Sequence, residues 1–310
     1  MIKHALFSFL FVFSICKESK SQYYFYNNDY YDKPIMFEIG ASIGGMNCFT
    51  DLGGRKGIGK SFTKDMNLKN TQLAGSVYFS ATYNNAITLR LEGTFGQVSA
   101  YDSILKNVAP STYGRYERNL SFRSTIKEVM LVTELHPLYL FGNFEDRDPP
   151  LLSPYLVGGI GCFVFNPQAK LNNSWVYLHP LHTEGEGLPE YPDRPNYELV
   201  QINIPMGAGL RYELSPIFNI RAEVVYRKLN TDYLDDVSQT DYVDPTVFTN
   251  HFTGTRLTQA LLLYDRRYEL DPNNNGPGER GSTKHTDAYF TFNLKIGLTL
   301  GRERIKRGGR

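Results

Sequence analysis

Alternation of apolar and polar residues is the strongest pattern in this chain. From Ala288 to Leu300 every second residue is apolar, whereas the residues between them are polar, glycine or tyrosine. A period of two predicts a β-strand with one apolar and one polar face. A strand of a soluble core would show this pattern, and so would a strand with lipid on one side and a polar barrel lumen on the other.

The same alternation recurs along the chain and predicts eight strands. They are expected at residues 35–49, 71–83, 86–99, 120–138, 154–165, 197–214, 217–229 and 287–300. Asn84-Asn85 and Ser215-Pro216 mark tight turns between neighbouring strands. The fourth strand loses its phase near Lys127 and Glu128, which suggests a β-bulge there.

The connections between these strands alternate in length. Four are long and polar, covering residues 50–70, 100–119, 166–196 and 230–286, and the others are the two tight turns and the moderate segment 139–153. Long loops at one end, short turns at the other and an even strand number are typical of outer-membrane barrels. A secreted β-sandwich or a lipocalin-like barrel, the alternatives, give no reason for this alternation. The prediction is an all-β fold: an eight-stranded antiparallel transmembrane outer-membrane β-barrel with long extracellular loops.

The polar faces of the predicted strands carry charges of both signs. A barrel of eight strands is only wide enough for its own side chains, and unpaired buried charges are costly. We therefore expect a paired, hydrogen-bonded plug and no open pore. Arg211 and Glu213 fall on the same inner faces. The candidate lumen charge network comprises Glu38, Arg90, Glu92, Arg221, Glu223, Arg227 and Lys295.

The N-terminus has the features of a secretory signal. A basic start precedes the apolar stretch 5–15, and Ser19-Lys20-Ser21 is a small-x-small cleavage site. A lipoprotein signal at Cys16 is the alternative, although Ile15 is bulky for a lipobox. We expect four parts: a signal peptide (1–21), a periplasmic N-terminal segment (22–34), the barrel (35–301) and a basic periplasmic tail (302–310). After the signal, no apolar run is long enough for a transmembrane helix.

Two cysteines follow the signal, Cys48 and Cys162. They fall within strands expected to lie apart in the sheet. Two free, packed thiols are therefore favoured over a disulfide, although cysteines of an exported protein can pair.

Five stretches together resemble a known family. They are "FEIGASIGGMNCFTDLG" (37–53), "NLSFRSTIKEVMLVTEL" (119–135), "SPYLVGGIGCFVFNP" (153–167), "HTEGEGLPEYPDRPNYELVQINIPMGAGLRYELSP" (182–216) and "TDYLDDVS" (231–238). In this order they resemble the PorG-like outer-membrane barrels of Bacteroidota, components of the type IX secretion system. The chain departs from many outer-membrane barrels by continuing past its last strand as "GRERIKRGGR" (301–310).

The resemblance implies a non-enzymatic anchor or assembly factor in the outer membrane of a Gram-negative bacterium. Its implied partners are the periplasmic PorK–PorN ring proteins of the secretion and gliding pathway, besides outer-membrane lipid. It supplies no catalytic residues and implies no cofactor. The net charge of +1 gives no field that would attract nucleic acid.

Two charged segments are the candidate periplasmic contacts. The connection 139–153 and the basic tail would both emerge on that side; a solvated tail is the simpler interpretation of the second. The aromatic segment 22–34 suits partner binding and interfacial anchoring equally. The candidate contact residues are Glu145, Asp146, Arg147, Asp148, Arg302, Arg304, Lys306 and Arg307.

The outer loops contain residues with other possible chemistry. The acidic segment 231–245, with Asp232, Asp235, Asp236, Asp241 and Asp244, could bind calcium through oxygen ligands, but its spacing is not that of an EF-hand, and a solvated acidic loop is favoured. "GGRKGIGK" (53–60) does not match the spacing of a phosphate-binding loop. The loop histidines His179, His182, His251 and His285 accompany no nucleophile or zinc motif, so no enzyme is predicted.

Overall fold

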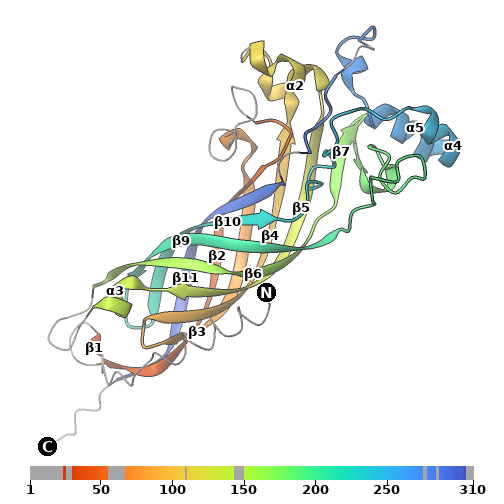
Figure 1. Cartoon of the computed structure of the whole chain (residues 1–310). Helices are drawn as coiled ribbons and strands as arrows, with labels where there is room; N and C mark the ends of the chain where they lie inside the picture. The colour runs from red at the N-terminus through yellow and green to blue at the C-terminus, as the bar shows by residue number, and fades with distance from the viewer. Residues whose placement is uncertain are drawn as a thin grey trace, which may run out of the picture.

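The computed structural model describes residues 24–25, 30–54, 67–108, 110–142, 150–274, 278–283 and 286–304. Its main feature is a closed barrel of eight antiparallel strands (Figure 1). Strand β4 closes it by pairing with both β3 and β5. The barrel strands are β2 (Tyr30–Phe49), β3 (Gln72–Tyr83), β4 (Ile87–Tyr101), β5 (Ser121–Leu135), β6 (Leu152–Val164), β9 (Val200–Glu213), β10 (Phe218–Leu229) and β11 (Ala288–Arg304).

These strands confirm the predicted eight-stranded barrel. Each predicted strand is present, and the two tight turns are present as well. Asn84 and Asn85 both have positive φ, 47° and 57°, the conformation that a two-residue hairpin requires and that asparagine tolerates. At the second turn, the backbone N–H of Ser215 donates to the carbonyl of Phe218 at 3.0 Å.

The predicted bulge in the fourth strand is wrong. β5 pairs with β4 residue for residue, from Ser121 opposite Tyr101 to Leu135 opposite Ile87. The strand keeps one phase, but its chemistry changes along its length. Near the long loops β5 turns apolar side chains inward, including Ile126, and polar ones outward, including Lys127.

The outer wall of the barrel carries an apolar belt, which we call the lipid belt. Ile43, Val77 and Phe95 point outward with 61%, 66% and 61% of their surface exposed, and outward apolar residues of the other barrel strands continue the belt. Apolar surface of this extent is stable only against lipid. Among the described residues no helix is long and apolar enough to cross a membrane, a finding that concerns helices alone.

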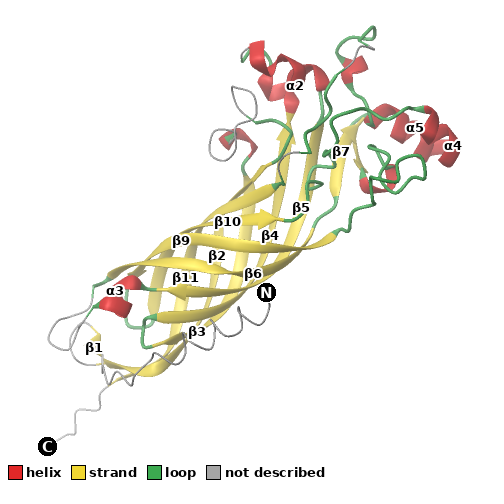
Figure 2. Cartoon of the chain, in the orientation of Figure 1, coloured by secondary structure: helices red, strands yellow, loops and turns green. Residues whose placement is uncertain are grey.

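The long connections gather at one end of the barrel, as Figure 2 shows, and we call their described residues the head. At the other end lie α3 (Pro137–Phe141) and β1 (Tyr24–Phe25), which pairs with β2. The head contains η1 (Leu68–Asn70), η2 (Asp102–Leu105), η3 (Pro110–Thr112), α2 (Tyr113–Arg118), β7 (Pro167–Leu171), β8 (Ser174–Tyr177), η4 (His179–Leu181), α4 (Thr246–His251), α5 (Gly254–Leu263) and η5 (Arg267–Glu269).

Two apolar cores support the head. One fills the upper barrel, where Met46, Val98 and Phe122 are fully buried between the strands and the loops above them. The other lies among β7, β8, α4 and α5 and includes Phe248 and Leu263. The long loops therefore pack on one core that they share with the barrel and on a second core of their own, which their polar composition did not predict.

Candidate functional site

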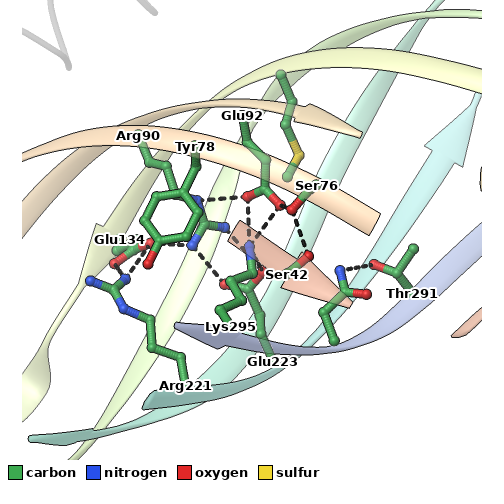
Figure 3. Close-up of polar contacts among 12 residues, drawn as sticks. Ser42, Ser76, Tyr78, Arg90, Glu92, Glu134, Arg221, Glu223, Thr291 and Lys295 are labelled. Atoms are coloured by element: carbon green, nitrogen blue, oxygen red, sulfur yellow. Dashed lines mark hydrogen bonds and ion pairs between the residues drawn. The ribbon is translucent and has the colours of Figure 1, made fainter. Parts of the chain in front are cut away.

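The lumen at the level of the lipid belt holds a connected set of ion pairs (Figure 3). Arg90, from β4, lies at its centre. Its guanidinium Nε is 3.0 Å from Glu92, its Nη1 is 2.8 Å from Glu223, and it also contacts Glu134. Lys295 from β11 completes this side of the network, because its Nζ lies 2.6 Å from Glu92 and 2.8 Å from Glu223.

Arg221 extends the network toward the short-turn end. It bridges two carboxylates, with one Nη 2.7 Å from Glu38 and the other 2.8 Å from Glu134. The Tyr78 hydroxyl donates to Glu38 at 2.6 Å. The structure thus brings six of the seven expected lumen residues into one network. The seventh, Arg227, pairs with Glu128 at 3.1 Å.

Two lumen carboxylates, Glu128 and Glu134, were absent from the sequence-based network. Both lie on the inward face of β5 and are 3% and 0% exposed. The bulge expected near Lys127 left the inward face of this strand unassigned. An uninterrupted period of two through residues 121–135 would have found both.

Charge is balanced in the part of the lumen that the structure describes. Each of the six carboxylates and six cations named at the end of this paragraph takes part in at least one ion pair. These side chains are all buried, so along the described strands they fill the lumen and leave no open channel. Their pairing offsets the cost of burying charge. The six carboxylates are Glu38, Glu92, Glu128, Glu134, Glu213 and Glu223, and the six cations are Arg90, Arg211, Arg221, Arg227, Lys295 and Arg302.

At the short-turn end, Arg302 belongs to the barrel mouth. Its Nη2 lies 2.9 Å from Glu213, its Nη1 donates to the carbonyl of Pro216 at 3.1 Å, and its side chain is 1% exposed. A solvated tail therefore does not begin at this residue. β11 runs on to Arg304, opposite Tyr30. The side chain of Arg304 lies outside the described residues, as do Glu145, Asp146, Arg147, Asp148, Lys306 and Arg307.

In the head, Asp235 and Asp236 are each 1% exposed, which corrects the expectation of a solvated acidic loop at this point. Asp236 accepts hydrogen bonds from the hydroxyls of Tyr197 and Thr183, both at 2.6 Å. Asp235 accepts from the backbone N–H groups of Leu52 and Val237. Leu52, Thr183 and Tyr197 come from segments far from the aspartates in the sequence, so the buried aspartates tie the loops together.

Burial raises the pKa of several carboxyl groups in the head. It raises the pKa of Glu184 to about 7, although Arg280 lies 3.0 Å away and opposes this. Burial, reinforced by the charge of Asp51, raises the pKa of Asp232 to about 8. Burial also raises the pKa of Asp235 and Asp287 well above the usual range. No group of three or more histidine, cysteine or carboxylate side chains in the described ranges is arranged to hold a metal ion.

The remaining sequence candidates have structural contacts. His179 and His182 contact the backbone carbonyls of Tyr197 and Glu186 at 2.9 and 2.5 Å. His251 pairs with Glu190 at 2.8 Å at the surface of the head. His285 and residues 55–60 of the glycine-rich stretch lie outside the described residues.

Both cysteines are free thiols, as expected. Only Cys48 is packed inside. Cys162 points outward and is exposed, because it lies on the outward face of β6.

Comparison with protein-family models finds no match for this chain, and comparison with curated proteins finds none. Among solved structures it is similar to Neisserial surface protein A, at 9% identity and a TM-score of 0.37, over 84% of this chain and 96% of that one. It is also similar to Ail of Yersinia pestis, at 10% identity and a TM-score of 0.34, over 86% of this chain and 97% of that one. A third similar structure is the N-terminal barrel of Pseudomonas aeruginosa OprF, at 10% identity and a TM-score of 0.33, over 87% of this chain and 99% of that one. The closed strand order and the lipid belt of the chain itself give it the fold of an outer-membrane β-barrel.

Proposed function

We propose that this chain is a non-enzymatic outer-membrane component of a type IX protein secretion system, which also serves gliding where that occurs. It anchors or assembles PorK–PorN-type ring proteins on the periplasmic side of the outer membrane of a Gram-negative bacterium. The observation that carries this proposal is the ordered set of five stretches resembling the PorG-like family, spread over residues 37–238.

The closed lumen supports a role at the ends of the barrel. Arg90, Arg221 and Lys295 fill the centre together with their carboxylate partners, so cargo has no route through the barrel. A plugged barrel acts through its surfaces. The short-turn end offers the connection 139–153 and the residues beyond Arg302 to a periplasmic partner.

The test is a mild-detergent pull-down of the tagged protein from outer membranes, with mass spectrometry of the proteins recovered. We expect the ring proteins with the wild type and their loss when Glu145, Asp146 and Asp148 are changed to lysine. A matched control changes Asp241 and Asp244, exposed in the head, to lysine and keeps the ring. A folded barrel recovered without ring proteins, together with unchanged cargo export after gene deletion, would contradict the proposal.

The second candidate function is a surface barrel whose head binds a ligand or tethers the cell. The observation in its favour is that the head is folded around an apolar core, in which Phe248 and Leu263 are 0% and 2% exposed, so it presents an ordered outer surface. Deleting residues 246–263 separates the candidates. A periplasmic anchor keeps its export activity without α4 and α5, whereas a surface binder loses its function.

A further inference from the structure

The sign of charge differs between the two faces of the barrel wall. Every strand carboxylate whose side chain is described on the eight barrel strands points into the lumen. Near the head, the outward charged side chains of these strands are all cationic: Arg123 and Lys127 on β5 and Lys228 on β10. A surface of one sign next to lipid favours anionic headgroups.

Strands β7 and β8 extend this cationic surface beside β5. Arg123 lies opposite Gln168, and Lys170 lies opposite Trp175, so these side chains share one face. The Arg123 guanidinium stacks 3.7 Å from the centre of the Trp175 ring, and its Nε donates to Gln168 at 3.0 Å. We call this surface, with Lys127 and Tyr177, the β5–β8 face.

The opposite side of the same hairpin is fixed. Ala169 is buried in the head core, and Val176 packs against that core. The hairpin therefore presents the β5–β8 face at a set position. Stacking with Trp175 and the bond from Nε to Gln168 leave the donors on the terminal nitrogens of Arg123 for a further acceptor, because guanidinium has more donors than these contacts use.

The β5–β8 face lies directly above the lipid belt. Lys127 is opposite Phe95 and Val164, which point outward with 61% and 42% exposure. Arg123 is four residues farther toward the head, about 13 Å along the strand. Tryptophan, tyrosine and cationic side chains with apolar stems are the residues that suit the headgroup layer. The position of the β5–β8 face above the lipid belt and its residue types are therefore those expected of the headgroup layer.

We propose that the β5–β8 face binds the phosphate groups of a bisphosphorylated lipid headgroup in the leaflet on the head side. Arg123, Lys127 and Lys170 supply the positive charge, and Trp175 holds Arg123 in place while it packs against the upper acyl and sugar region. Glu269, on the adjoining η5, is paired with Arg266 at 2.9 Å and therefore competes less for these cations. Arg266 also donates to Ser121 at the start of β5.

The chain contains one tryptophan, so its fluorescence reports on this face alone. The full chain in zwitterionic micelles would be titrated with bisphosphorylated lipid A, dephosphorylated lipid A and inorganic phosphate. We expect a saturable signal with bisphosphorylated lipid A only. At about fivefold per cation, the variant K127Q/K170Q, which keeps the Arg123–Trp175 stack, should weaken the affinity about 25-fold.

Two controls make the result decisive. The charge-preserving variant K127R/K170R should bind as the wild type does, and K228Q, which removes an outward cation elsewhere on the barrel, should change the affinity less than twofold. Equal binding by K127Q/K170Q and the wild type would overturn the proposal. Equal weakening by K228Q, or equally tight binding of inorganic phosphate, would also overturn it, since these results indicate diffuse charge and a free-anion site respectively.

Discussion

Two regions of this molecule bury carboxylates, and they surround them with different groups. In the lumen, Glu92 lies against the cations Arg90 and Lys295. In the head, Asp236 accepts hydrogen bonds from two neutral hydroxyls, those of Tyr197 and Thr183. The first region keeps its charge by pairing it, whereas the second holds carboxyl groups whose pKa values are raised.

The difference between the two interiors follows from what surrounds the outer wall of the barrel at each level, lipid or water. At the lipid belt the outer wall is apolar, so the polar side chains of each strand face the lumen. Beyond the belt the outer wall faces water, and the same strands turn apolar residues such as Val98, Phe122 and Phe163 inward. One strand can therefore belong to two differently built interiors without a break in register.

The largest expected effect comes from removing the central cation. Arg90→Met leaves Glu92, Glu134 and Glu223 without one of their cationic partners in a buried site, which should cost on the order of 5 kcal/mol. The measurement is urea unfolding in lipid vesicles, followed by the heat-dependent gel shift of a folded barrel. Glu269→Gln, at the surface of the head, is the control. Unchanged unfolding of Arg90→Met would contradict the ion-paired lumen.

The second test separates the head from the barrel. Phe248 is fully buried and packs 5.2 Å from the ring centre of Tyr264. Phe248→Ala should destabilise the head by about 4 kcal/mol while the barrel keeps its gel shift. Limited proteolysis would show cleavage confined to the head, and Tyr113→Ala, at an exposed position, serves as the control. Loss of the barrel in Phe248→Ala would show that the two regions fold as one unit.

The third test uses pH. Because burial raises the pKa of Glu184 to about 7, from an ordinary value of 4.5, the folded head binds more protons than the unfolded head between these values. The contribution of Glu184 to the stability of the head is fully present below 4.5, the pKa in the unfolded state, and is lost as pH rises through about 7, the pKa in the folded state. A pKa shift of this size corresponds to about 3 kcal/mol in the free energy of unfolding of the head.

Limited proteolysis at pH 5.5 and pH 8 should therefore show a head that opens more readily at the higher pH. Glu184→Gln should reduce this dependence, since it removes one of the titrating groups. Proteolysis of the head that does not change with pH would refute the difference between its carboxylates and those of the lumen.

The smallest effect is local. Asn84→Ala places a side chain that disfavours positive φ in the β3–β4 turn, where φ is 47°, and should cost about 1 kcal/mol. Asn84→Gly should be neutral or slightly stabilising. Both are measured by urea unfolding, and a cost for glycine equal to that for alanine would point to a role of the side chain.

The barrel could be predicted from sequence because each strand keeps a period of two against a single solvent on each face. β5 shows where this reasoning failed. Its outward residues change from Val129 and Leu131 to Lys127 and Arg123 as the strand leaves the lipid belt. The change resembled a slip of register, and it concealed Glu128 and Glu134.

The head could not be predicted, because its stability comes from contacts between separate loops. Leu52 donates to Asp235, and Thr183 donates to Asp236, across 183 and 53 residues of sequence. One feature of the head, the turn of the β7–β8 hairpin, had a local signal in the sequence. Asn172 and Asn173 both have positive φ and form the turn of the β7–β8 hairpin, with the same residue pair as the turn at Asn84-Asn85.

Planar-bilayer recording of the full chain tests the central claim, that paired side chains close the lumen of the barrel. At high salt the wild type should give no steady unit conductance, because Arg90, Arg221 and Lys295 remain paired with their carboxylates inside the barrel. Discrete, stable openings of the wild-type protein would contradict a closed lumen and would make transport through the barrel the function to explain.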